Sequence, residues 1–125
     1  MVDSAGPQGP AALLARYHAA LDRLDFDALV GMFAPDAVYL SNGVGSLKGR
    51  DEIISAFRDY FGRFAHEESV DTRIEEIGPN TVRSHWRLRA RDRDGGKHVH
   101  RGGIETIWFD NDGLIVSVLV DDDTG

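Results

Sequence analysis

The spacing of apolar residues changes from a helical to a strand period near residue 68. Before that point, apolar side chains recur at steps of three and four residues, which predicts helices at about 10–24 and 50–64. The stripes of these two helices consist of Leu13, Leu14, Tyr17, Leu21 and Leu24, and of Ile53, Phe57, Phe61 and Phe64. Pro10 suits the first turn of a helix, where its missing N–H costs nothing.

A short second helix is expected after Asp25, whose carboxylate can cap it. Its apolar residues would be Leu29, Val30, Met32 and Phe33, and Pro35 would end it. Residues 37–41 predict a short strand, followed by a loop at 42–45.

After residue 68, residues of alternating character predict four strands. They are expected around residues 70–74, at 81–92, at 97–109 and at 114–120, with turns between them that contain glycine. Helices followed by an antiparallel meander indicate an α+β domain with helices on one face of the sheet.

The turn Asp94-Gly95 is typical of a hairpin and determines which residues share a face. A two-residue turn there places Ser84 opposite Glu105, Trp86 opposite Gly103, Leu88 opposite Arg101 and Ala90 opposite Val99, all on one side of the sheet. The other side carries Arg83, His85, Arg87, Arg89 and Arg91, with His98 and His100 opposite the last two.

The first of these sides is apolar enough to meet the helices, yet it includes Glu105. A glutamate in that position must be paired, neutral or beside a wet cavity. An ion pair with Arg101, two levels away on the same face, is the structural alternative to a role in a pocket. The second, basic side would be solvated or would pack on a partner.

Composition narrows the classes of function. The chain has 125 residues, a formal net charge of -7 and no cysteine. The charge argues against a general nucleic-acid binder, and without cysteine there is no disulfide or thiolate chemistry. No apolar run is long enough to cross a membrane, and no secretory signal is recognisable. We expect a cytoplasmic protein with a disordered segment at 1–9 and one domain at 10–122.

Several segments together resemble the SnoaL-like and ketosteroid isomerase-like families of the nuclear transport factor 2-like superfamily. The resemblance covers about residues 10–120 and rests on the order of residues 15–21, 25–38, 49–53 and 112–115. It implies a cone-shaped, curved antiparallel sheet, with about three N-terminal helices, that encloses a pocket. Many members are dimers through the outer face of the sheet, so the resemblance implies a homodimer on the basic side.

The resemblance also implies site residues. In ketosteroid isomerase a tyrosine and a protonated carboxylic acid form the oxyanion hole. These two groups match Tyr17 and Glu105. The family's carboxylate base falls on Ser41 or Asn42, depending on the direction of counting, and neither can serve as a carboxylate base. His18, a water held by Ser41 and Asn42, or the substrate itself would have to replace it.

The remaining candidates are residues that could bind a ligand: Trp86, Leu88, Phe57, Arg101 and Leu40. Each also has a purely structural interpretation. Trp86 could be core packing, Arg101 could extend to the rim, and Asn42 could simply supply turn geometry. His18 could likewise lie at the edge of the helix's buried stripe. His98 and His100 face arginines, which disfavours a metal site, and no cofactor is expected.

Two hypotheses remain open from the sequence. The first is an isomerase- or cyclase-like enzyme acting on a small apolar carbonyl compound, which Tyr17 and Glu105 would polarise. The second is a non-catalytic ligand-binding or dimerisation module of the same fold. The missing base favours the second, and the retained tyrosine and acid favour the first.

Overall fold

Three helices and six strands make up the described part of the chain, residues 9–41 and 45–122 of a computed structural model. The helices are α1 (Pro10–Asp22), α2 (Phe26–Val30) and α3 (Arg50–Arg63). The strands are β1 (Phe33–Ser41), β2 (Gly45–Lys48), β3 (Phe64–Gly78), β4 (Thr81–Asp92), β5 (His98–Phe109) and β6 (Ile115–Asp122). The segment expected to be disordered, 1–9, lies outside the described residues except for Gly9.

Local signals explain where the first two helices begin and end. Pro10 opens α1 as predicted. The helix ends at Asp22, two residues earlier than predicted, and Leu24 adopts a positive φ of 55°. Asp25 then caps α2 by accepting a hydrogen bond from the Ala28 amide at 3.1 Å. None of the helices in the described ranges has the length and continuous apolar character that a membrane-spanning segment needs.

The prediction that Pro35 ends α2 is wrong. The helix stops at Val30, and Phe33 and Pro35 belong to β1. A proline is tolerated in this strand because the pairing of β1 with β6 is irregular between Phe33 and Val38, so the ladder does not need its missing N–H there. Phe64, predicted as the last residue of the third helix, instead begins β3.

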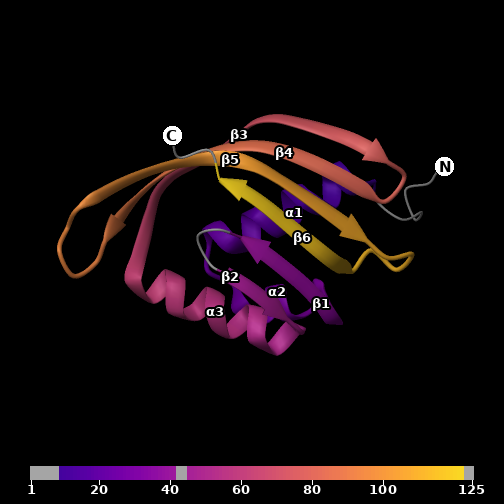
Figure 1. Cartoon of the computed structure of the whole chain (residues 1–125), viewed down its shortest axis with the longest axis horizontal. Helices are drawn as coiled ribbons and strands as arrows, with labels where there is room; N and C mark the ends of the chain where they lie inside the picture. The colour runs from indigo at the N-terminus through magenta and orange to yellow at the C-terminus, as the bar shows by residue number, and fades with distance from the viewer. Residues whose placement is uncertain (1–8, 42–44, 123–125) are drawn as a thin grey trace.

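The six strands form one curved sheet in the order β2-β1-β6-β5-β4-β3. Figure 1 shows β3, β4, β5 and β6 arching over the helices, with the β4–β5 hairpin reaching beyond them. The meander from β3 to β6 is antiparallel as predicted, but β1 runs parallel to β6. The sheet is therefore mixed, which corrects the expected all-antiparallel sheet.

The register predicted for the β4–β5 hairpin is confirmed. Ser84 pairs with Glu105, Trp86 with Gly103, and Leu88 with Arg101. Ser84 and Glu105 are buried, which shows that this side meets the helices. On the opposite side the basic residues are partly neutralised by β3, since Glu67 lies near Arg89, Arg91 and His98, and Glu75 near His85.

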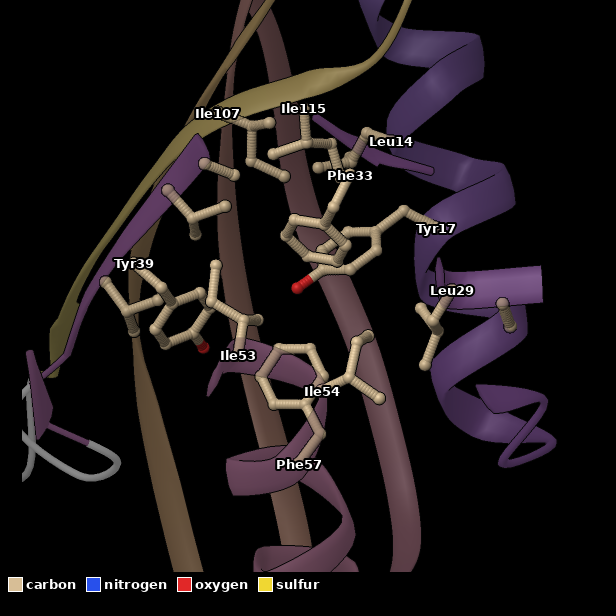
Figure 2. Close-up of a cluster of buried hydrophobic side chains, with 14 of the residues drawn as sticks. Leu14, Tyr17, Leu29, Phe33, Tyr39, Ile53, Ile54, Phe57, Ile107 and Ile115 are labelled. Carbon is tan, nitrogen blue, oxygen red and sulfur yellow. The ribbon is translucent and has the colours of Figure 1, made fainter. Parts of the chain in front are cut away.

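The core lies between the concave face of the sheet and the three helices. Figure 2 shows residues of α1, α3, β1 and β5 meeting there, with the hydroxyl groups of Tyr17 and Tyr39 pointing inward. Phe33 packs edge-on against Tyr17 and Phe57, and Tyr39 packs edge-on against Phe57. This aromatic core holds α1 against the sheet at the level of the cavity described next.

Candidate active site

His18 forms the centre of a polar cluster between α1 and the sheet. It follows the fully buried Tyr17 on α1, at the border of the helix's buried stripe. Its Nδ1 lies 2.8 Å from Oδ2 of Asp71, and its Nε2 lies 2.6 Å from Oε1 of Glu105. Both ring nitrogens are therefore hydrogen-bonded to carboxylates.

The two carboxylates come from strands that flank β4. Glu105 on β5 pairs with Ser84, and Asp71 on β3 pairs with Trp86. The Ser84 hydroxyl donates to Oδ1 of Asp71 at 2.8 Å, which fixes the second oxygen of that carboxylate. Within the described residues, the Glu105 side chain accepts one hydrogen bond, at Oε1 from His18. Oε2 of Glu105 therefore remains available to a ligand.

Electrostatics determines the protonation of this cluster. Burial by itself would lower the pKa of His18, but the charge of Glu105 and the hydrogen bonds to Asp71 and Glu105 outweigh it and raise the pKa to about 10. Burial likewise raises the pKa of the Asp71 carboxyl, yet the hydrogen bonds from His18 and Ser84 bring it below its usual value. At neutral pH His18 is thus an imidazolium ion between carboxylates.

A cavity opens beside this cluster and contains about 110 Å³ of space for the centres of water-sized molecules. One water needs roughly 10–15 Å³ on this measure, so a small organic molecule can enter. The walls are mostly aromatic and aliphatic, with polar groups at intervals. The lining residues are Tyr17, His18, Leu21, Asp22, Tyr39, Ser41, Phe57, Tyr60, Phe61, His66, Ser69, Asp71, Trp86, Leu88, Arg101, Glu105 and Val120.

Two tyrosines, Tyr17 and Tyr39, are among the residues that line this cavity. The hydroxyl of Tyr17 is buried and has no hydrogen-bond partner in the described part of the chain. Burial, followed by the proximity of Tyr39 and Glu105, raises the pKa of Tyr17 well above its usual value. Burial and the charge of Glu105 also raise the pKa of Tyr39. Both phenols keep their protons and are hydrogen-bond donors.

A second polar group lies elsewhere on the cavity wall. Arg101 donates from Nη2 to Asp122 and from Nη1 to the Tyr60 hydroxyl at 3.2 Å. That hydroxyl also lies 3.3 Å from Nε2 of His66. The predicted alternative partner of Glu105 is therefore wrong: Arg101 pairs with Asp122, and Glu105 pairs with His18.

Most of the residues singled out from the sequence come together at this cavity. Tyr17, Glu105 and Ser41 line it, as do the ligand-binding candidates Trp86, Leu88, Phe57 and Arg101. Leu40 does not. Its side chain is 46% exposed because it projects from the opposite face of β1 to Tyr39 and Ser41. We therefore correct the prediction for Leu40. Asn42 lies outside the described residues.

Sequence reasoning missed Asp71 and undervalued His18. Asp71 lies between Val70 and Thr72 in the strand expected around residues 70–74, and no local signal singles it out. A strand paired with β4 must bring one of its residues opposite Trp86, but the alternation of β3 is interrupted by register shifts and does not show which residue that is. Across residues 9–41 and 45–122, no cluster of three or more acidic or histidine side chains is arranged to hold a metal ion.

The comparisons with known proteins agree with this fold. A model of the SnoaL-like domain family matches residues 14–118. No curated protein matches the chain. Among solved structures, an LEH-like epoxide hydrolase of M. tuberculosis is 21% identical, with a TM-score of 0.77 over 90% of this chain and 80% of that one.

Two further solved structures share the fold. A ketosteroid isomerase-like protein from Erwinia carotovora atroseptica is 15% identical, with a TM-score of 0.76 over 93% of this chain and 95% of its own. A computationally designed 17-OHP binder is 16% identical, with a TM-score of 0.77 over 91% of this chain and 93% of its own. Identities this low relate the folds and leave the chemistry to be derived from the site.

Proposed function

Because the chain belongs to the SnoaL-like domain family, whose fold carries many chemistries, we propose a function from its own site: proton transfer on a small, mostly apolar carbonyl compound, of the isomerase or cyclase type. The observation that carries the proposal is the 2.6 Å contact between His18 and Glu105 at the wall of the cavity. Glu105 supplies a carboxylate at the wall of the cavity. The family's usual base position, Ser41 or Asn42, has no carboxylate.

Glu105 is the base in this proposal. Oε2 takes a proton from the carbon next to the carbonyl, and the electrons of the broken C–H bond form an enolate. The imidazolium of His18 cannot itself accept a proton, since its pKa of about 10 keeps it charged at neutral pH. Its role is to orient Glu105 through Nε2, while Asp71 orients His18 through Nδ1. His18 and Asp71 are therefore positioning residues.

Tyr17 and Tyr39 stabilise the enolate. A donor with no partner in the resting protein can bind the developing oxyanion without first breaking another bond, and such preorganised donors contribute a large share of catalysis. In the part of the chain that the structure describes, the Tyr17 hydroxyl is such a donor. If the substrate has a β,γ double bond, the enolate is conjugated with it, and the proton on Glu105 returns to the γ-carbon, which completes an isomerisation. Alternatively, the enolate carbon attacks a second carbonyl of the same molecule. That carbonyl oxygen takes up the proton from Glu105, and a ring is closed.

A non-catalytic ligand-binding module is the second candidate, and one observation favours it. Both nitrogens of His18 are already hydrogen-bonded, so the cluster is electrostatically satisfied without a ligand. In that case the cavity would bind a carbonyl compound through Tyr17 and leave its C–H bonds intact.

Exchange of α-hydrogens for deuterium separates the two candidates and does not require the natural product to be known. Small cyclic ketones are incubated with the protein in D₂O and followed by NMR. We expect exchange above the buffer rate, reduced about 10²- to 10⁴-fold in Glu105→Gln, the range for removing a general base. Tyr17→Phe should also reduce the exchange rate.

The matched control is Glu75→Gln, which removes a carboxylate that pairs with a histidine, His85, on the other face of the sheet. It should exchange ketones at the wild-type rate. Saturable binding without exchange would identify the binding module. Equal exchange rates in wild type and folded Glu105→Gln would exclude Glu105 as the base.

A further inference from the structure

The cavity contains a second hydrogen-bonding group that the proposed proton transfer does not use. Tyr60, His66 and Arg101 all line it. The Tyr60 oxygen lies 3.2 Å from Arg101 and 3.3 Å from His66, at or just beyond the long end of the usual range of roughly 2.7–3.2 Å for hydrogen bonds with a nitrogen. Weak internal bonds of this kind are replaced easily by a polar atom of a ligand.

The protonation of this group follows from its surroundings. Burial, and after it the charge of Arg101, lowers the pKa of His66 below its usual value, so the ring is neutral at neutral pH. Arg101 donates to the Tyr60 oxygen, which leaves the phenol proton to point at Nε2 of His66. His66 then carries its own proton on Nδ1. The group thus offers donors and acceptors with no free positive charge, because Asp122 compensates Arg101.

This group and the Glu105 site lie at different levels of the sheet. Glu105 pairs with Ser84, whereas Arg101, four residues back along β5, pairs with Leu88. At about 3.4 Å per residue, these levels are roughly 13 Å apart. The level between them belongs to Trp86 and Gly103. An apolar stretch of wall therefore separates the two polar groups.

The charges around the cavity disfavour an anionic ligand. Two cationic side chains and three carboxylates line it among the described residues: His18, Arg101, Asp22, Asp71 and Glu105. Arg101 is in addition paired with Asp122. A carboxylate entering near Tyr60 would face this negative balance in a partly desolvated site, where charges are weakly screened.

From these observations we propose that Tyr60 and His66 form a distal subsite for a neutral oxygen, such as a phenol or alcohol hydroxyl, and that the ligand is an elongated molecule with a carbonyl at one end and this oxygen at the other. The inference rests on the proposed function for placing the carbonyl beside Tyr17 and Glu105. Tyr60 and His66 are specificity-determining residues here and take no part in the proton transfer.

Three probes of one skeleton test the subsite by titration calorimetry: 4-phenylcyclohexanone, 4-(4-hydroxyphenyl)cyclohexanone and 4-(4-oxocyclohexyl)benzoic acid. We expect the hydroxylated probe to bind about 3- to 10-fold more tightly than the parent, the value of one net hydrogen bond, and the carboxylate to bind more weakly than the parent. Equal affinity for parent and phenol, tightest binding of the carboxylate, or no saturable binding of any probe would overturn the proposal.

Variants assign the preference to the residues. In Tyr60→Phe the hydroxylated probe should bind with about the same affinity as the parent ketone, while the affinity for the parent ketone is retained. His66→Phe provides the same test should Tyr60→Phe fold poorly. Its matched control is His98→Phe, because His98 pairs with Glu67 on the other face and its loss should leave the preference intact. Persistence of the preference in both folded subsite variants would contradict the assignment.

Deuterium exchange of the same probes keeps this inference separable from the proposed function. A hydroxyl preference that depends on Tyr60, without α-hydrogen exchange, would retain the subsite and reject the enzyme. Exchange without any hydroxyl preference would retain the enzyme and reject the subsite.

Discussion

His18 is the residue whose charge depends most on the fold. An exposed histidine is mostly neutral at pH 7, whereas this one is held as an imidazolium by Asp71 and Glu105. Its protonation therefore contributes to stability as well as to the site. Because the folded pKa, about 10, is above the ordinary value of 6.5, the contribution is complete below pH 6.5 and disappears as the pH rises through about 10.

The pH dependence of unfolding tests this. We expect the free energy of unfolding, measured with urea, to fall more for the wild type than for His18→Gln between pH 6.5 and 10. The difference should be on the order of 2 kcal/mol, typical of hydrogen bonds to charged groups. The comparison removes the titration of other groups. His98→Gln, which alters an exposed histidine that pairs with Glu67, should follow the wild type. Parallel curves for wild type and His18→Gln would show that His18 is not held as a cation.

The acid limb has the opposite sign. The folded pKa of Asp71 is below its ordinary value of 3.8, so its contribution is present above pH 3.8 and is lost as the pH falls through the folded pKa. Both contributions are therefore complete only between about pH 4 and 6.5.

The site residues predicted on β4 and β5 share one property: the local pattern defined their face. Glu105, Trp86, Leu88 and Arg101 follow from the Asp94-Gly95 turn and the two-residue period. The prediction for Leu40 was wrong because nothing local shows which face of β1 meets the core. Asp71 could not be derived because β3 contains register shifts, one of them between Asp71 and Arg73, and every shift changes the alternation of faces.

At the scale of elements, the path of β5 past β6 depends on a residue without a side chain. A Cβ at Gly103 would clash with the backbone oxygen of Asp121. Real side chains essentially never approach a backbone atom so closely, so β5 or β6 would have to move. The two strands carry Glu105, Arg101 and Asp122, and their spacing therefore affects both polar groups of the cavity.

Gly103→Ala should destabilise the protein by about 1–3 kcal/mol, the usual cost of overpacking. It should also weaken binding of the ketone probes, since β5 carries Glu105 and Arg101. Chemical denaturation and calorimetry measure the two effects. Gly62→Ala is the control within α3, where an added Cβ meets nothing within 4 Å. It should stabilise the helix by roughly 0.5–1 kcal/mol. Unchanged stability of Gly103→Ala would show that β5 and β6 adjust freely.

The elements were predictable where they depend on neighbours in the sequence. The starts of α1 and α3, the Asp25 cap and the β4–β5 register all follow from local patterns. The strand β1 was placed only in part, because Pro35 has a helix-ending signal that the irregular β1–β6 pairing overrides. A parallel pair of strands that are far apart in the chain leaves no such local signal.

At the scale of the whole molecule, the outer face of the sheet exposes a row of apolar side chains. Leu40 lies opposite Leu119, and Leu119 lies opposite Thr106, which shares its face with Ile104 and Trp108. All four apolar side chains are exposed. Apolar residues exposed together on a sheet face are typical of contact surfaces. The homodimer on this face stays a prediction, with an apolar row where the sequence suggested a basic surface.

Analytical ultracentrifugation tests the dimer. We expect the wild type to sediment as a dimer, and Leu119→Arg or Trp108→Arg to shift it to the monomer, since each would bury an unpaired charge in an apolar interface. Arg87→Glu, on the same face of β4 but among the charged residues, is the control for charge itself and should leave the dimer intact. A monomeric wild type at micromolar concentration would reject the interface.

The pairing of β1 with β6 joins residues 33–41 to residues 115–120, and this has a consequence for folding. Contacts so distant in the chain cost loop entropy before they contribute energy, and they slow folding. During synthesis, Tyr39 and its neighbours lack the partner strand of their second edge until almost all of the chain has been made. The hollow that holds the proposed chemistry can then close only as one of the last steps of maturation, and a nascent chain arrested before residue 115 should expose its aromatic lining to chaperones.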